Sequence, residues 1–312
     1  MEKLIVIIGP TAVGKTRLSI DLAHRLNTEI ISGDSMQIYS GMNIGTAKAS
    51  RTEQEGIPHH LIDIIPPTGD FSVVDFQNLA AKQITDLNQQ NKIPILCGGT
   101  GLYIKALLEG YIFHPAPGND PERKRMEAEA EIYGNQYLHD RLAAVAPHIA
   151  SQLHPNDRNR IIRALETHAQ PGEKLLTGKK TVDGNLMYEA AVIGLMMERH
   201  TLYERINQRV DQMVHHGLLD EVSDLLASGV SPDAQSMQAI GYKEIVAHLQ
   251  GKTDLDTAIS RIKQSTRHFA KRQITWYKKM SYIQWFQIEH FADYGQLLEA
   301  VYRSIAGKFH FK

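Results

Sequence analysis

Short apolar runs alternate with amphipathic stretches along the first part of the chain. The run Leu4–Ile8 is continuous and rich in β-branched residues, which is the pattern of a strand buried on both faces. A glycine-rich loop follows, and Leu18, Leu22 and Leu26 then recur at helical spacing. A strand, a glycine loop and a helix in this order predict the beginning of an α/β fold.

Four further apolar runs fit parallel strands, with helical segments between several of them. The runs cover residues 29–32, 61–65, 93–97 and 190–195. One of the helical segments is predicted for Val74–Gln90, and several helices are predicted between about 200 and 280. We therefore predict an α/β fold, a P-loop-type parallel sheet flanked by helices.

A change in composition indicates a second domain. Prolines and a glycine gather in Pro115–Pro121, and a charged helical stretch, Glu122–Glu131, follows. A second loop-like zone lies between Gln170 and Asn185. We expect residues 116–185 to form a mainly helical insertion domain, and residues 1–115 and 186–312 to form the catalytic core with its C-terminal helices.

Composition narrows the class of protein without identifying a partner. The net charge of −1 means that any nucleic-acid site must come from an uneven distribution of charge. The one cysteine, Cys97, cannot form an internal disulfide, which fits a reducing compartment. No run approaches the roughly 20 apolar residues of a membrane span. We expect a monomeric cytoplasmic protein with no membrane partner.

The glycine loop has the pattern of a phosphate-binding P-loop, G-x-x-x-x-G-K-[ST]. It consists of Gly9, Pro10, Thr11, Ala12, Val13, Gly14, Lys15 and Thr16. Such glycines let backbone N–H groups turn inward around an anion, and the helix that follows adds its N-terminal partial charge. Lys15 supplies a charge for phosphate oxygens, and the Thr16 hydroxyl is suited to Mg²⁺.

The position of the nearest carboxylate argues against ordinary ATP hydrolysis. Many P-loop NTPases carry an Asp at the end of a second strand to hold Mg²⁺, but the run 93–97 ends in Gly98–Gly101. Asp34 instead follows the run 29–32, so it should lie at the ligand-binding edge of the sheet. Its role is either that of a general base or that of a turn-former. Thr100 either caps a helix or faces the site.

Eight blocks, taken in order, resemble the tRNA dimethylallyltransferase (isopentenyl-tRNA transferase) family. They are Gly9–Thr16, Ile31–Tyr39, Met42–Lys48, Pro58–Asp63, Gly98–Tyr103, His154–Asp157, Arg160–Glu166 and Thr266–Trp276. The P-loop alone is unspecific, whereas the combination is specific and extends over nearly the whole chain. Without a C-terminal zinc-finger extension, the chain resembles the bacterial form.

The resemblance implies transfer of the dimethylallyl group of dimethylallyl diphosphate to N6 of the adenine 3′-adjacent to the anticodon, with release of diphosphate. It implies a requirement for Mg²⁺, held by Thr16, and a P-loop that holds the donor's diphosphate. The implied catalytic residues are Lys15, Thr16 and Asp34. The implied contacts to the tRNA anticodon stem-loop are Asp34, Ser35, Met36, Gln37, Thr100, Arg123, Asn159, Arg160, Ile161, Ile162 and Arg163.

A basic helix is predicted near the C-terminus. Residues 261–280 contain seven Lys or Arg and no Asp or Glu, and Lys263, Arg267 and Lys271 share one side of the helix. Such a stripe suits an RNA backbone, although a solvated helix face gives the same pattern. With the resemblance, we expect Arg267 and Lys271 to bind tRNA.

Two rival functions share the P-loop. A small-molecule kinase would use ATP and could place Arg160 and Arg163 on phosphate, and its product would be ADP. A nucleotide-dependent RNA-binding switch would bind RNA without forming a covalent product, and it leaves the position of Asp34 unexplained.

Overall fold

The computed structural model describes residues 1–113, 121–169 and 185–310, which fall into two compact units. The first, here called the core unit, comprises residues 1–110 and the chain from 181 onward. The second, here called the helical unit, comprises residues 111–180. The expected start of the insertion domain, residue 116, lies outside the described residues. Its expected end, Asn185, is the first residue described after the second gap.

The core unit is built on a sheet of six described strands, ordered β3-β2-β4-β1-β5-β6, in which every pairing is parallel. The strands are β1 (Lys3–Ile8), β2 (Ile30–Ser32), β3 (His59–His60), β4 (Ile95–Gly98), β5 (Glu189–Met196) and β6 (Gln284–Gln287). The predicted α/β class is confirmed. Because the strands are parallel, their carboxyl ends lie at one edge of the sheet.

Helices cover both faces of this sheet, which explains the continuous apolar strands. In β1, Leu4, Val6 and Ile8 pack into one buried cluster, and Ile5 and Ile7 pack into the other. The first cluster includes α2 (Val73–Gln89) and α3 (Gly101–Glu109), and the second includes α1 (Lys15–Leu26) and α12 (Tyr294–Phe309).

The prediction of a strand over residues 61–65 is wrong. The ladder with β2 is limited to His59 and His60, and Ile65 makes only an isolated bridge with Tyr39. Leu61 and Asp63 have positive φ angles of 60° and 55°, which no strand can contain. Of the residues in this run only Leu61 is buried, and Ile64 is exposed, so the apolar run marks neither a strand nor a buried segment here. The short strand β6 was missed, since its four residues carry no repeated pattern.

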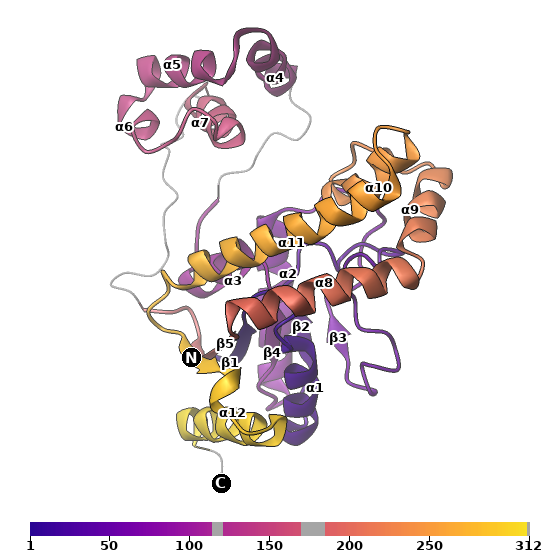
Figure 1. The fold of residues 1–312 in the computed structure, drawn as a ribbon. Coiled ribbons are helices and arrows are strands. Elements are labelled where there is room, and N and C mark those ends of the chain that lie inside the picture. Colours follow the sequence, from indigo (N-terminus) through magenta and orange to yellow (C-terminus); the bar gives the residue numbers. More distant parts are fainter. Residues whose placement is uncertain (114–120, 170–184, 311–312) are drawn as a thin grey trace. The chain divides into compact units, whose positions relative to one another are not determined.

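Four long helices complete the described core unit: α8 (Arg199–His215), α9 (Leu218–Ala227), α10 (Tyr242–Leu249) and α11 (Leu255–Tyr277). Helices α8 and α11 run side by side (Figure 1). Asp254 begins α11 by accepting a hydrogen bond from the N–H of Thr257 at 2.8 Å. In the part of the chain that the structure describes, no helix is both long and apolar enough to cross a membrane.

The helical unit has a core of its own. Its helices are α4 (Pro121–Tyr133), α5 (Asn135–Val145), α6 (Pro147–Ala150) and α7 (Arg158–Ala169). Met126 of α4, Leu138 and Leu142 of α5, and Ile161 and Ile162 of α7 form a buried cluster. A separate core of this kind is what a compact folding unit requires.

Candidate active site

The P-loop joins β1 to α1 in a conformation that needs its glycines. Gly9 has a φ of 151°, and a Cβ atom there would lie 2.7 Å from the carbonyl oxygen of Leu195. Gly14 has a φ of 104° and occupies the N-cap position of α1. Both positions lie in the region of positive φ that glycine adopts without steric cost. The loop therefore directs the first N–H groups of α1 toward a common space, as an anion site requires.

Lys15 is folded back over the loop. Its Nζ donates to the carbonyl oxygens of Gly9 and Pro10 at 3.0 and 2.8 Å. Burial lowers the pKa of Lys15 to about 8, while Cys97 and Asp34 oppose that shift. The cation is thus poorly solvated, and a polyanion beside it would stabilise its charge. Lys15 therefore lies where its charge would respond to a bound anion.

Asp34 and Thr100 lie at the same edge of the sheet, after β2 and β4. The Oδ1 atom of Asp34 accepts from the N–H of Met36 at 2.9 Å, which forms the turn. Within the described residues, its Oδ2 atom makes no hydrogen bond. Thr100 occupies the N-cap position of α3 without a side-chain cap, and its Oγ1 instead accepts from the N–H of Ser35 at 3.0 Å. Thr100 therefore serves the Asp34 turn, and Asp34 keeps one oxygen for a ligand.

Gln273 of α11 connects the P-loop to the end of β4. Its Oε1 accepts from the N–H of Thr11 at 2.9 Å, and its Nε2 donates to the carbonyl oxygen of Gly99 at 2.8 Å. The side chain is only 5% exposed. A Cβ atom at Gly99 would lie 2.4 Å from that Nε2, so the glycine makes room for the clamp. No local signal predicts this contact, because it joins Thr11 and Gln273, which lie 262 positions apart.

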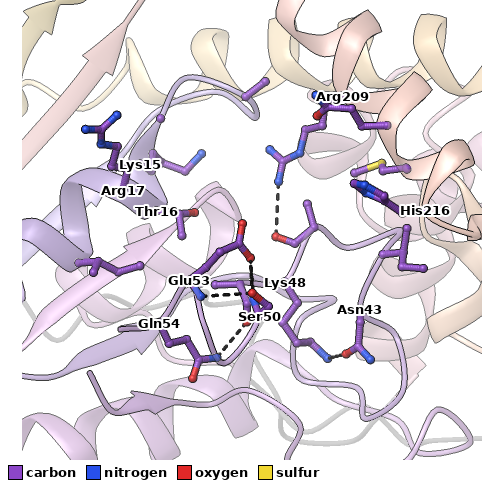
Figure 2. Close-up of a pocket in the computed structure, with 18 of the residues that line it drawn as sticks. Lys15, Thr16, Arg17, Asn43, Lys48, Ser50, Glu53, Gln54, Arg209 and His216 are labelled. Atoms are coloured by element: carbon purple, nitrogen blue, oxygen red, sulfur yellow. Dashed lines mark hydrogen bonds between the residues drawn. The ribbon is translucent and has the colours of Figure 1, made fainter. Parts of the chain in front are cut away.

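A cleft of about 1210 Å³ opens beside the P-loop (Figure 2). One wall is the start of α1 with Lys15 and Thr16, and the other is α8 together with the loop after β2 (Figure 2). Its basic lining residues are Lys15, Arg17, Lys48, Arg51, Arg205 and Arg209. Its acidic lining residues are Asp21, Glu53, Glu55 and Asp63. Because Lys48 pairs with Asp63 and Arg17 with Asp21, the anion-binding character of the cleft depends on the other cations, among them Lys15 and Arg209.

Arg209 is the cation of α8 that belongs most closely to the P-loop. Its Nη2 donates to the carbonyl oxygen of Ala47 at 3.4 Å (Figure 2). Burial lowers its pKa, and the negative charge of Asp34 opposes that shift. Lys15 and Arg209 also repel each other, so an anion bound beside both would stabilise them. Arg209 carries no signal in the sequence, because one arginine in an amphipathic helix is ordinary.

The basic stripe on α11 is partly paired with α8. Lys263 forms an ion pair with Asp211 at 2.6 Å, and the Nη1 of Arg267 donates to Asn207 at 2.6 Å. Lys271 is exposed. Lys271 would therefore be open to a phosphate, whereas at Arg267 a phosphate would have to replace the neutral amide of Asn207. The expected tRNA contacts of these two residues stay a prediction.

The expected tRNA residues of the helical unit differ in their surroundings. Asn159 and Arg160 are exposed, and Arg163 is half-buried at 3.6 Å from Glu166. Ile161 and Ile162 are fully buried in the unit's core, which leaves their side chains no surface for RNA.

Arg123 is held within the helical unit by carboxylates. Its Nη1 donates to both carboxylate oxygens of Glu166, at 3.1 and 3.3 Å, and its Nε lies 3.1 Å from Glu127. Glu166 is buried, so loss of Arg123 would leave a buried carboxylate without this partner and would destabilise the unit whether or not RNA binds.

Comparison with known proteins supplies the context for this geometry. The model of the family described as IPP transferase matches residues 37–280. A tRNA dimethylallyltransferase of Alkaliphilus metalliredigens is 46% identical, with 99% of each chain covered. One of Bacillus subtilis is 47% identical, with 98% of each covered.

Solved structures give the same result. The full-length tRNA isopentenylpyrophosphate transferase of Bacillus halodurans has a TM-score of 0.75 at 45% identity, and the match covers 99% of this chain and 97% of that one. A eukaryotic dimethylallyltransferase acting on tRNA has a TM-score of 0.81 at 29% identity, with 100% and 81% covered.

Proposed function

The chain belongs to the IPP transferase family, and from this premise we infer that it transfers a dimethylallyl group to tRNA. We further propose that the donor is dimethylallyl diphosphate, that the acceptor is N6 of the adenine 3′-adjacent to the anticodon, and that diphosphate leaves. One observation carries the finer proposal. The P-loop lies beside two partly buried cations that form no ion pair within the described residues, Lys15 and Arg209, and at the same sheet edge as a carboxylate with a free oxygen.

The leaving group is the first requirement of this chemistry. The allylic C1–O bond breaks readily, because the carbon fragment delocalises its positive charge, and negative charge builds up on diphosphate. Lys15, Arg209 and the N-terminus of α1 are already in place to stabilise that charge. Their mutual repulsion in the free chain is relieved when the anion is bound, so the site favours diphosphate over a neutral group.

The acceptor is the second requirement. The N6 lone pair of adenine is delocalised into the ring, so the amine is a weak nucleophile. As the N6–C1 bond forms, a proton must leave the nitrogen, and the Oδ2 atom of Asp34 is available to accept it. The turn that fixes Oδ1 on the Met36 N–H also fixes the direction of the second oxygen. We propose that Asp34 is the general base.

Mg²⁺ belongs to the same proposal. The Thr16 hydroxyl is exposed in the cleft at the start of α1, where it would hold Mg²⁺. There it would supply further neutralisation of the leaving group. β4 ends in Gly98 and not in a carboxylate, which suits a cation brought together with the donor.

The tRNA contacts complete the proposal. The target adenine must leave its stack to reach Asp34, at a cost of a few kcal/mol. We propose that Ser35, Met36, Gln37 and Thr100 surround the extruded base, and that Arg267 and Lys271 bind the phosphate backbone. For Arg123, Asn159, Arg160 and Arg163, contact with the anticodon stem-loop stays a prediction, as does a monomeric state.

The test uses labelled dimethylallyl diphosphate with unmodified tRNA and Mg²⁺. We expect the label in tRNA, on the adenine 3′-adjacent to the anticodon after nuclease digestion, together with one diphosphate for each transfer. In a parallel reaction, ATP replaces the donor. Formation of ADP without labelled tRNA would refute the proposal in favour of a kinase. Tight RNA binding with no covalent product from either donor would favour a nucleotide-dependent switch.

A further inference from the structure

Glu221 of α9 holds the backbone of the loop that follows the Asp34 segment. Its Oε2 accepts from the N–H groups of Asn43 and Ile44, each at 2.8 Å, and its Oε1 accepts from the N–H of Gly45 at 3.1 Å. Consecutive N–H groups directed at one point form an anion-binding nest. Here the anion is a side chain of the same protein. Charge-assisted hydrogen bonds are about twice as strong as neutral ones, so the loop is firmly fixed at this point.

Tyr242 of α10 strengthens the same contact. Its hydroxyl donates to Oε1 of Glu221 at 2.6 Å, and its side chain is fully buried. Burial and the carboxylate both raise the pKa of Tyr242, so the hydroxyl stays protonated and remains a donor. The ring lies directly against Gly45, where a Cβ atom would come within 2.4 Å of it.

The fixed loop presents two carbonyl oxygens to residues of the active site. Hydrogen bonds between Asn43 and Lys48, and between Ile44 and Ala47, close the loop into a turn, each at 3.0 Å. The carbonyl oxygen of Ala47 then accepts from Arg209. A loop held at its start thus orients a guanidinium that the P-loop site uses.

The carbonyl oxygen of Thr46, next to Ala47 in the same loop, accepts a hydrogen bond from the other side of the site. The Nε2 of Gln37 donates to the oxygen of Thr46 at 3.4 Å. Gln37 belongs to the same segment as Asp34, where we place the target base. Glu221 therefore lies outside both halves of the site and supports one residue in each, Arg209 and Gln37.

We propose that Glu221 is a positioning residue for the transfer reaction. Its carboxylate fixes the loop Asn43–Lys48 and, through the Ala47 carbonyl, directs the Arg209 guanidinium toward the diphosphate held by the P-loop. This rests on the diphosphate site of the proposed function. Glu221 touches neither substrate, so its effect must pass through Arg209, which makes the inference testable by coupling.

The decisive variant is Glu221→Gln, which keeps the size of the side chain and replaces one accepting oxygen by an amide that faces N–H donors. We expect binding of inorganic diphosphate with Mg²⁺ to weaken by about tenfold. This factor corresponds to the loss of roughly one charge-assisted hydrogen bond. kcat/KM for dimethylallyl transfer should fall by at least a similar factor. The matched control is Asp224→Asn, an exposed carboxylate on the same helix, which should change neither quantity.

A double-mutant cycle with Arg209→Gln distinguishes positioning from general damage. If Glu221 acts through Arg209, then Glu221→Gln should weaken diphosphate binding by no more than about twofold when Arg209 is already gone. Additive losses would overturn the inference, as would unchanged diphosphate binding in Glu221→Gln. If Glu221→Gln does not fold, Tyr242→Phe removes one donor to the carboxylate and carries the same cycle. Wild-type protein that binds no diphosphate would instead refute the proposed site.

Discussion

Replacing Gln273 by leucine tests whether the P-loop depends on a clamp from a distant helix. The change leaves two backbone groups without their partners, the N–H of Thr11 and the carbonyl of Gly99. An unsatisfied buried group costs roughly 1–3 kcal/mol. Gly99 is buried, whereas Thr11 is half-buried and within reach of water. We therefore expect Gln273→Leu to lower the free energy of unfolding by about 2–4 kcal/mol.

The assay is urea unfolding of the variant beside its matched control, with diphosphate affinity as the second measurement. Gln264 lies exposed on the same helix, so Gln264→Leu should change the free energy of unfolding by no more than about 0.5 kcal/mol. Because the Thr11 N–H belongs to the P-loop, Gln273→Leu should also weaken inorganic diphosphate binding. A loss of stability below about 0.5 kcal/mol, together with wild-type diphosphate affinity, would refute the clamp.

Three further predictions concern charge. Asp34→Asn should lower kcat by roughly 10²–10⁴-fold while the Kd for tRNA is unchanged, and single-turnover rates at saturating tRNA check this. The burial that lowers the pKa of Lys15 from 10.5 to about 8 makes the unfolded chain bind more protons between these values, so stability should rise from pH 8 to 10.5. As the pH rises from about 8, Lys15 loses its proton, so the wild-type protein should bind inorganic diphosphate less tightly, and Lys15→Arg should remove that loss. A ratio of wild-type affinity to Lys15→Arg affinity that does not change with pH would contradict this prediction. Lys271→Ala should lower the salt slope of tRNA binding by about one. Lys263→Ala should change that slope less, because Lys263 is paired with Asp211. A salt slope of Lys271→Ala equal to that of the wild-type protein would make the stripe an ordinary solvated face.

Local signals in the sequence predicted the parts of the fold and site that local chemistry determines. The apolar runs gave β1, β2, β4 and β5, since strands buried on both faces need no alternation. The P-loop pattern and the position of Asp34 after β2 follow from adjacent residues. The prediction of a strand over residues 61–65 was wrong because it also used only local signals. Apolar residues in a turn and in a strand can give the same run of residue types, and here the positive φ angles of Leu61 and Asp63 show that the backbone turns.

The residues that sequence reasoning missed have one feature in common, which is that their partners lie far away in the chain. Gln273 is 262 positions from Thr11, Arg209 is 162 from Ala47, and Glu221 is 178 from Asn43. Each reaches the sheet edge from a different helix, α11, α8 or α9. Each of these contacts is made to a backbone group, so no pair of residue types could reveal it. The P-loop has glycines at positive φ, and glycine favours many conformations, so the loop's own sequence does not make it rigid. Its geometry therefore has to be imposed by surrounding helices. It follows that substitution of Glu221 on α9 or of Gln273 on α11 should alter diphosphate binding, although neither side chain touches the diphosphate.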